Sequence, residues 1–248
     1  MPIATLLLLA SCLVVGIFIG AVGIGGVLLV PALMVFSRLS VHQAAATALF
    51  SFFFTGLLGA WLFGRRGTIS WKVAGPVCAG AFALSYAGAA AGTRIQPAIL
   101  MWIIAAILLF AGLYIVLSKT QMPTGKDKRY RAGTLLGIGA ASGFGAGISG
   151  AGGPLFSVPL MLALQFDPLV AVGTGQVVQI ASSFSGSLSN MSSGAIQYGL
   201  ALPVTLAELI GVLAGVRIAH AAPGKYLRSA AAALCIVSAA GMVAKTVF

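Results

Sequence analysis

Glycine-rich stretches are the parts of this chain whose composition best suits the binding of an anion. Two of them, 20–26 and 143–154, lie within long uncharged runs, and the second ends in Pro154. A helix that begins after such a break directs free amide N–H groups and the positive end of its dipole at the break. Two such helix starts facing each other would bind an anion without a buried Lys or Arg. The residues that we expect to contribute are Gly23, Gly25, Gly26, Ser149, Gly150, Gly152 and Gly153.

Close helix packing is the alternative explanation for these glycines, because small residues spaced by three or four let membrane helices approach each other. A protease is a further alternative, since the string 147–150 (GISG) resembles the GxSG motif of rhomboid intramembrane proteases. Ser149 would then be the nucleophile and His220 its base. That string belongs to a repeated glycine break, however, and the other copy has Val22 in place of the serine. We therefore expect no enzymatic activity, no catalytic residue and no bound metal or cofactor.

Polar side chains at helical spacing follow the second break and form one stripe along 168–191. The stripe consists of Gln176, Gln179, Ser183, Ser187 and Asn190. We expect it to line a polar path, with Gln176, Gln179 and Asn190 contacting the anion. Buried hydrogen bonds between helices are the alternative. Two threonines at matching places of the repeat described below, Thr47 and Thr174, could donate hydroxyls to an oxyanion or bond back to their own helices.

Glu208 is the one carboxylate that falls within an expected membrane span. Asp127 lies in a basic linker, and Asp167 precedes a helix that it can cap. An ionisable side chain inside the membrane is by default a functional hypothesis. Glu208 could carry a coupling proton or pair with Arg217, although nine residues along one helix is too far for a local ion pair.

The two glycine breaks belong to an internal repeat. A shift of 127 positions aligns 8–77 with 135–204 without a gap. The aligned glycines include the pairs Gly16/Gly143, Gly20/Gly147, Gly23/Gly150, Gly25/Gly152 and Gly26/Gly153. We therefore divide the chain into a first membrane repeat (1–118), a basic linker (119–131) and a second membrane repeat (132–248).

Each repeat is expected to contain a glycine-broken helix pair followed by three spanning helices. Glycine and proline interrupt the long first helix, and a short helix follows at 27–36 or 154–165. The spanning helices are predicted at 41–63, 73–92 and 98–117 in the first repeat, and at 168–191, 198–216 and 227–247 in the second.

The composition excludes a soluble domain, because 60% of the 248 residues are hydrophobic and only 7% are charged. A helix needs about 20 apolar residues to span a bilayer, and several uncharged runs exceed that length. The period-2 alternation of a membrane barrel is missing, so an all-α integral membrane protein is expected. The net charge of +11 then reports the topology of the chain and not a nucleic-acid partner.

The distribution of Lys and Arg predicts that the two repeats are inverted. If each broken pair enters the membrane and returns, 11 basic residues fall on one side and 3 on the other; if each pair crosses once, the split is 9 to 5. The positive-inside rule favours the first arrangement. It assigns the linker 119–131 to the cytoplasm and both termini to the opposite side of the inner membrane. An odd number of crossings makes the repeats inverted.

The doubled motif resembles the TauE/SafE sulfite exporter family. The segments 20–34 (GAVGIGGVLLVPALM) and 147–161 (GISGAGGPLFSVPLM) each open one half of the chain. The string 171–175 (AVGTG) resembles a string in the second half of proteins of that family. The resemblance implies a bacterial inner-membrane permease that moves sulfite or organosulfonate anions, usually outward. The first repeat departs from the second in that Ala46 precedes Thr47, where Gly173 precedes Thr174.

These observations together predict a secondary transporter that exports a small sulfur oxyanion by alternating access, with the anion bound between the two helix starts. An anion channel is the alternative. The partners that we expect are the anion, the lipid bilayer, a coupling proton and a second copy of the chain.

Overall fold

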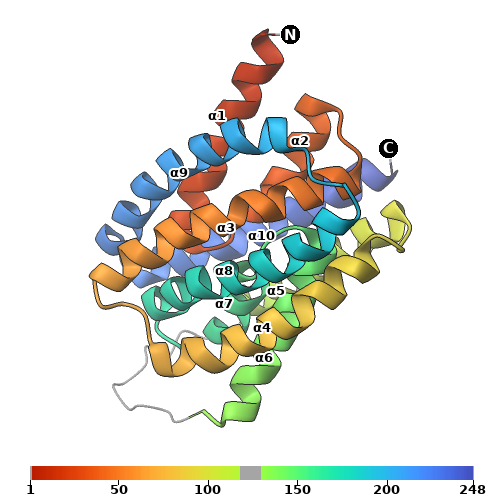
Figure 1. Cartoon of the computed structure of the whole chain (residues 1–248). Helices are drawn as coiled ribbons and strands as arrows, with labels where there is room; N and C mark the ends of the chain where they lie inside the picture. Colours follow the sequence, from red (N-terminus) through yellow and green to blue (C-terminus); the bar gives the residue numbers. More distant parts are fainter. Residues whose placement is uncertain (1, 118–129, 248) are drawn as a thin grey trace.

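The computed structural model describes residues 2–117 and 130–247, and this part of the chain is helical throughout apart from its turns (Figure 1). The predicted all-helical fold is therefore confirmed. The elements are α1 (Pro2–Val22), the 3-10 turn η1 (Gly26–Leu28), α2 (Leu29–Ser37), α3 (Val41–Arg65), α4 (Trp71–Gly92), α5 (Pro97–Leu117), α6 (Ala132–Ser149), α7 (Pro154–Ala163), α8 (Pro168–Ser192), α9 (Tyr198–Ala221) and α10 (Gly224–Val247).

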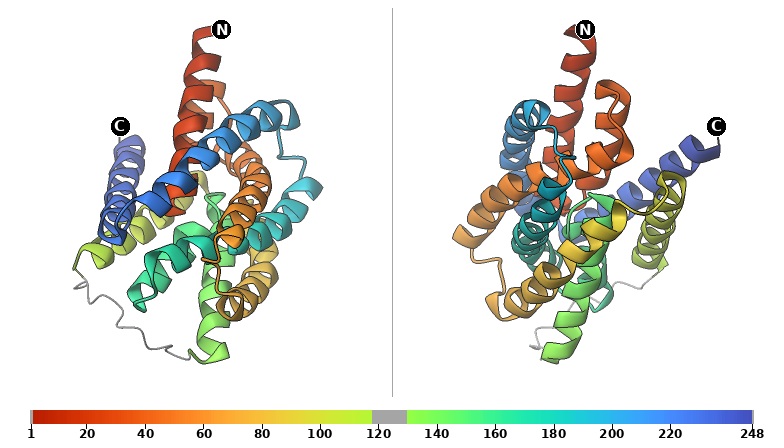
Figure 2. Two further views of the ribbon diagram at one scale, coloured as in Figure 1. Left: turned by 90° about the vertical axis from the view of Figure 1, so that its left-hand side faces the viewer. Right: turned by 45° about the vertical axis from the view of Figure 1, so that its right-hand side comes forward.

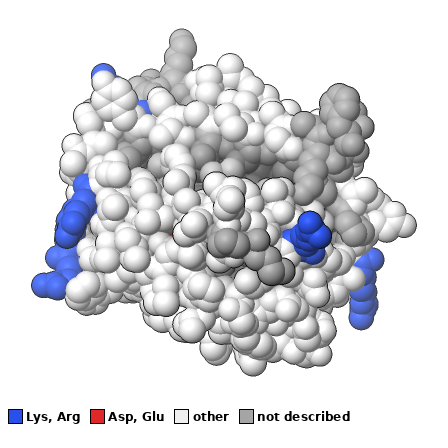
Figure 3. Space-filling model, turned by 90° about the horizontal axis from the view of Figure 1, so that it is seen from above, with Lys and Arg blue, Asp and Glu red and all other residues white. Residues whose placement is uncertain are grey.

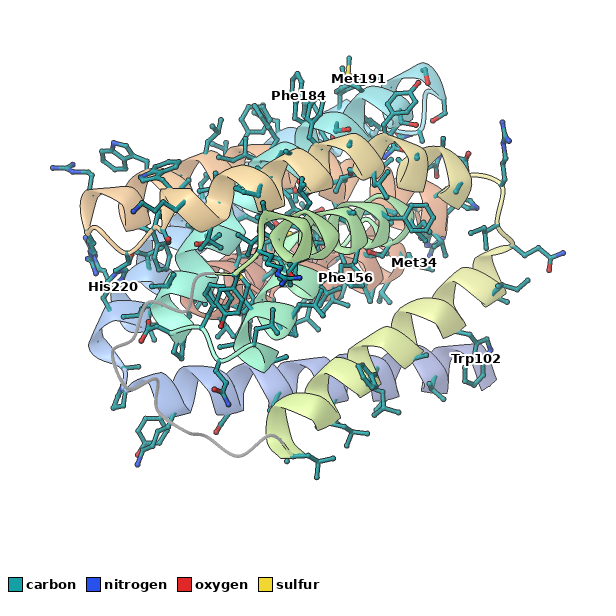
Figure 4. All side chains as sticks on the ribbon, turned by 90° about the horizontal axis from the view of Figure 1, so that it is seen from below. Met34, Trp102, Phe156, Phe184, Met191 and His220 are labelled. Carbon is teal, nitrogen blue, oxygen red and sulfur yellow. The ribbon has the colours of Figure 1, made fainter. Side chains whose placement is uncertain are left out.

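Among the described residues, five helices are long and apolar enough to cross a membrane: Ile3–Val22, Val41–Arg65, Trp71–Gly92, Ala132–Ser149 and Tyr198–Ala221. The 25-residue helix α8 is not one of them, because it carries the polar stripe. Large apolar side chains remain exposed on the outside of the bundle, including Phe82, Phe184 and Trp102. Figure 4 shows Phe184 and Met191 projecting away from the helices, as expected of side chains that face lipid.

The helices of the two halves follow one another at the interval of the sequence repeat. Three pairs of helix starts lie 127 residues apart: Val41 and Pro168, Trp71 and Tyr198, and Pro97 and Gly224. Local sequence explains where two of these helices begin. Ser40 and Gln43 form a capping box at the start of α3, and the Asp167 carboxylate accepts hydrogen bonds from two amides at the start of α8. The predicted cap role of Asp167 is thereby confirmed.

Each half packs its first helix against the other half. Helix α1 lies on α9, α6 lies on α4, and α3 lies on α8. Glycines make the first two crossings close: a Cβ added at Gly16 would overlap the carbonyl oxygen of Glu208, and one at Gly143 would overlap that of Ala81. The packing explanation therefore holds for these two glycines.

Helices α1 and α6 run toward the centre of the molecule from opposite ends. In Figures 1 and 2, α1 descends from the N-terminus at the top, whereas α6 rises from the bottom. Helices α2 and α7 contact α1 and α6, respectively, after the two glycine breaks. The breaks are thus brought into the interior from two sides.

Basic side chains gather at one end of α3, α4 and α9. Arg65, Arg66 and Lys72 surround the α3–α4 turn and are exposed. The ring of His220, near the end of α9, lies 4.9 Å from the ring of Phe63, between centroids. In Figure 3 most of the visible Lys and Arg side chains lie along the edge of the face, and one lies within it; no Asp or Glu is seen there.

Candidate functional site

The first glycine break separates α1 from η1 and α2. The amide of Gly23 donates to the carbonyls of Phe18 and Ile19 (3.2 and 3.0 Å) and closes α1. Its φ of +78° is left-handed, a conformation that glycine adopts without strain. A Cβ at Gly25 would lie 2.6 Å from the amide nitrogen of Ile19, so Gly25 also lets the break fold tightly against α1.

The second break separates α6 from α7. Gly150 and Gly152 are left-handed, with φ of +66° and +83°, and Pro154 occupies the first turn of α7. The hydroxyl of Ser149 donates to the Gly145 carbonyl (2.7 Å) and accepts from the amide of Ala151 (3.2 Å). Ser149 therefore stabilises the break itself. The predicted interruption of the helix is confirmed in both halves.

The two breaks meet at the ring of Phe52 in α3. A Cβ added at Gly26 would lie 2.9 Å from Phe52 Cε2 and would overlap the carbonyl oxygen of Ala151. From the other break, a Cβ at Gly152 would lie 3.3 Å from Phe52 Cδ2. A Cβ at Gly153 would lie 2.7 Å from Ser182 Oγ in α8. Gly26 and Ala151, which are 125 positions apart in sequence, are thus neighbours in the structure.

Polar side chains of α3 and α8 complete this meeting point. The Gln179 Nε2 donates to the Phe52 carbonyl (3.0 Å) and to Thr55 Oγ1 (2.8 Å), and Ser182 Oγ donates to the Gln179 carbonyl (3.2 Å). All four side chains are buried. We use the name central cluster for the residues Gly26, Phe52, Thr55, Gly152, Gly153, Gln179 and Ser182.

Backbone donors remain unused at the central cluster. Within the described part of the chain, the amides of Gly25, Gly26, Gly152 and Gly153 have no hydrogen-bond acceptor, and all four residues are buried. Buried amides are paired in the great majority of cases, because an unpaired one costs about 1–3 kcal/mol. Two helix starts with free, buried amides are suited to an anion.

Gln176 joins α8 to the end of α1. Its Nε2 donates to the Ile19 carbonyl (2.9 Å), and its Oε1, which faces Gly59, has no partner among the described residues. The alternative of interhelical hydrogen bonds is therefore realised for Gln176 and Gln179. Further along the stripe, the hydroxyls of Ser183 and Ser187 are buried and have no described partner.

Three residues expected at the site lie away from the central cluster. The hydroxyl of Thr47 accepts from the amide of Gln197 (3.0 Å), and Asn190 lies at the same end of α8. Thr174 lies at the opposite end, where the adjacent Gly173 packs against Phe63. Helices α3 and α8 are antiparallel neighbours. Residues that align in the repeat therefore lie far apart when they are near the ends of the helices, and lie close together only near the middle.

Phe52, Thr55 and Ser182 belong to the central cluster but were not expected at the site. The repeat contained a signal for two of them, since Thr55 and Ser182 are hydroxyl residues at aligned positions. Phe52 aligns with Gln179, and nothing in the sequence marked it as more than an apolar residue of a span.

Glu208 lies apart from the central cluster, in α9 where that helix crosses α1. Its side chain is fully buried, and neither carboxyl oxygen has a hydrogen-bond partner among the described residues. Ser51 of α3 and Cys12 of α1 lie close to its carboxyl. The alternative ion pair with Arg217 is not formed.

The geometry does not bring Ser149 and His220 together. Gly150, next to Ser149, packs against Ala45 near the start of α3, whereas His220 packs against Phe63 near its end. Eighteen residues of helix separate these two points, which corresponds to about 27 Å. His220 Nδ1 bonds to the Val216 carbonyl (2.8 Å) on its own helix. The two side chains cannot form a catalytic pair.

A comparison with known families decides the class of the protein. The sequence model described as "Sulfite exporter TauE/SafE" matches residues 8–242. The chain belongs to the sulfite exporter TauE/SafE family. This is a family of membrane transporters and not of enzymes, and a transporter of this family implies a small substrate. The resemblance noted in the sequence is confirmed, and the chain is a multi-pass membrane protein.

Two curated relatives of this TauE/SafE member come from Bacillus subtilis (strain 168). The chain is 29% identical to "Probable membrane transporter protein YdhB" over 235 residues, which cover 91% of the chain and 94% of that protein. It is 27% identical to "Probable membrane transporter protein YunE" over 221 residues, which cover 76% and 81%. No solved structure matches the chain.

Proposed function

We propose that this TauE/SafE member is a secondary transporter that exports a small sulfur oxyanion, such as sulfite or an organosulfonate, across the inner membrane. The observation that carries the proposal is the meeting of two helix starts whose buried amides have no acceptor among the described residues. The anion would bind at the central cluster, between Gly26 on one side and Gly152 and Gly153 on the other.

The chemistry of the central cluster suits an anion with three oxygens. Amides at two helix starts supply donors from opposite sides. The Ser182 hydroxyl can rotate toward a ligand, and Gln179 carries a side-chain amide beside it. A site without Lys or Arg binds a weakly charged anion without holding it too tightly to release, which a transporter requires.

The described conformation is closed around this site. The Phe52 ring lies against both breaks and is itself buried, so an anion can enter only when the ring moves. Complete burial of both breaks favours a carrier over an open channel. We infer that Phe52 separates the two helix starts between transport cycles.

Alternating access would arise from two inverted repeats that rock against each other. Support comes from the 127-residue interval between helix starts, the exchanged packing of α1 on α9 and of α6 on α4, and the opposite directions of α1 and α6 in Figure 2. The exposed basic residues at the α3–α4 turn support a cytoplasmic location for that end and for the linker 119–131.

The proposal is tested by counterflow of labelled sulfite in proteoliposomes containing the purified protein, with sulfonates and sulfate as competitors. A carrier accumulates label transiently against unlabelled sulfite, whereas a channel does not. Gly152→Leu should abolish counterflow because its side chain would fill the space beside Phe52. Gly194→Leu is the matched control: its φ is +65°, and no atom lies within 4 Å of an added Cβ. Equal counterflow in both folded variants would refute the site.

A further inference from the structure

The α1–α9 crossing buries a carboxyl group that the packing of the helices does not need. Glu208 is fully buried there, and its backbone carbonyl touches Gly16. The equivalent crossing of α4 and α6 brings the carbonyl of Ala81 against Gly143 in the same way. Since the second crossing is built with alanine, the side chain of Glu208 has no role in bringing the helices together.

The surroundings of the α1–α9 crossing are more polar than those of the α4–α6 crossing. Ser51 and Cys12 lie beside Glu208, whereas the residues aligned with them by the repeat are Val178 and Gly139. Ala81 and Val178 belong to an apolar cluster that is completed by Val77, Leu135 and Ile138. One crossing is therefore apolar, and the other carries the only buried carboxyl of the described residues.

Among the described residues, no charged partner faces Glu208 from the helices that pack against α9. Helix α1 contributes the Cys12 thiol and has no Lys, Arg or His. On α3 the ionisable residues are His42 and Arg65, at its two ends. On α9 itself, Arg217 and His220 lie more than two helical turns away. No nearby positive charge would therefore offset the desolvation free energy of an ionised carboxylate at this position.

The Ser51 hydroxyl lies beside the carboxyl of Glu208. Its proton is already donated to the Ala48 carbonyl (2.9 Å), so its oxygen is left to accept a hydrogen bond. A neutral carboxylic acid carries one O–H donor, and an ionised carboxylate carries none. A protonated Glu208 carboxyl can therefore donate its hydrogen bond to the Ser51 oxygen.

On the basis of the proposed transport function, we propose that Glu208 is the proton-binding site that couples transport to the proton gradient. In the closed conformation its carboxyl holds a proton. When α9 separates from α1 and α3, the O–H bond breaks, the proton passes to water on the open side, and the carboxylate is hydrated. Re-closure without a bound anion requires a proton to return from water, so the proton and the anion cross the membrane in opposite directions.

Helix α3 provides the mechanical link between the proton and the anion. Ser51 contacts the Glu208 site, and the next residue, Phe52, lies against both glycine breaks. A shift of α3 that moves the Phe52 ring away from the anion site must also move Ser51 away from the carboxyl. Opening of the anion site and exposure of the Glu208 carboxyl to water are thereby the same event.

The test compares wild type with Glu208→Gln, and with Asp167→Asn as a control at the exposed cap of α8. Glu208→Gln should keep sulfite counterflow, because exchange needs no net proton movement. It should lose accumulation driven by an imposed pH difference, which for one coupled proton reaches about tenfold per pH unit. Asp167→Asn should keep both activities. Gradient-driven accumulation that persists in Glu208→Gln would overturn the proposal.

A second measurement does not depend on transport. The infrared spectrum of the wild type at neutral pH should contain the C=O stretch of a protonated carboxylic acid that Glu208→Gln and Glu208→Ala both lack. The alanine variant should fold, because Ala81 fills the equivalent position. A spectrum without that band refutes proton binding. Wild type that shows the band but no sulfite counterflow would refute the transport function alone.

Discussion

Gly26 allows the spacing between the two breaks to be tested with one methyl group. Its backbone is not left-handed, so alanine fits the conformation and would by itself stabilise η1 by about 0.5–1 kcal/mol. The added Cβ would however overlap the Ala151 carbonyl and lie 2.9 Å from Phe52 Cε2, where ordinary contacts begin at 3.4 Å. The ring must retreat by about half an ångström, and the Ala151 backbone must move as well. Overpacking of this kind costs about 1–3 kcal/mol.

Gly26→Ala should therefore lower both the stability and the anion affinity. If the displaced break loses one hydrogen bond to the charged substrate, about 1.5–3 kcal/mol is lost, and the half-saturating sulfite concentration rises by about tenfold to a hundredfold. The assays are thermal unfolding in detergent and the concentration dependence of counterflow. Gly137→Ala, in α6 with no atom within 4 Å of the new Cβ, is the control and should be neutral or stabilising. A folded Gly26→Ala protein with unchanged sulfite affinity would refute an anion site between the breaks.

Two further predictions concern polar contacts of the chain. Gln179→Leu removes two hydrogen bonds to α3 and should lower the free energy of unfolding by about 1–3 kcal/mol. Ser183→Ala removes a hydroxyl that has no described partner and should change the free energy of unfolding by less than about 0.5 kcal/mol. Equal losses in the two variants would contradict the hydrogen-bond assignment. Burial raises the pKa of Tyr130, whose hydroxyl donates to the Leu164 carbonyl. The contribution of this hydroxyl to stability should therefore be complete below the ordinary tyrosine pKa of about 10 and be lost as the pH rises through the raised pKa. If alkaline unfolding of Tyr130→Phe keeps the same pH dependence, the tyrosine is not its source.

The sequence was informative about the helices because glycine and charge act locally. Positions 41, 168 and 198 were predicted as helix starts and are confirmed for α3, α8 and α9. Glycine clusters interrupt a helix wherever it packs, so both breaks could also be foreseen. The five spans recognised in the structure follow from runs of apolar residues alone.

The composition of the central cluster was only partly predictable, because it depends on which faces of α3 and α8 meet. Gln179 was expected from its polarity, but Phe52 was not, since a buried phenylalanine in a membrane helix needs no special explanation. Thr47 and Thr174 were expected to act together because they align in sequence. Antiparallel packing of α3 and α8 separates them to opposite ends, and this orientation is a tertiary property that no local pattern specifies.

The differences between the halves bear on the direction of transport. Two identical inverted repeats would give inward-open and outward-open states of equal free energy, and a bias of a few kcal/mol needs unequal residues at equivalent positions. Such residues include three pairs on α3 and its partners: Phe52 opposite Gln179, Ser51 opposite Val178, and Glu208 opposite Ala81. In the proposed mechanism the phenylalanine closes the anion site, and the carboxyl opposes hydration of the neighbouring crossing only while it is protonated. On the proposed mechanism, the state in which α9 is separated from α1 and α3 is therefore favoured on the side of the membrane that is poorer in protons, and the proton gradient sets the direction in which the anion is carried.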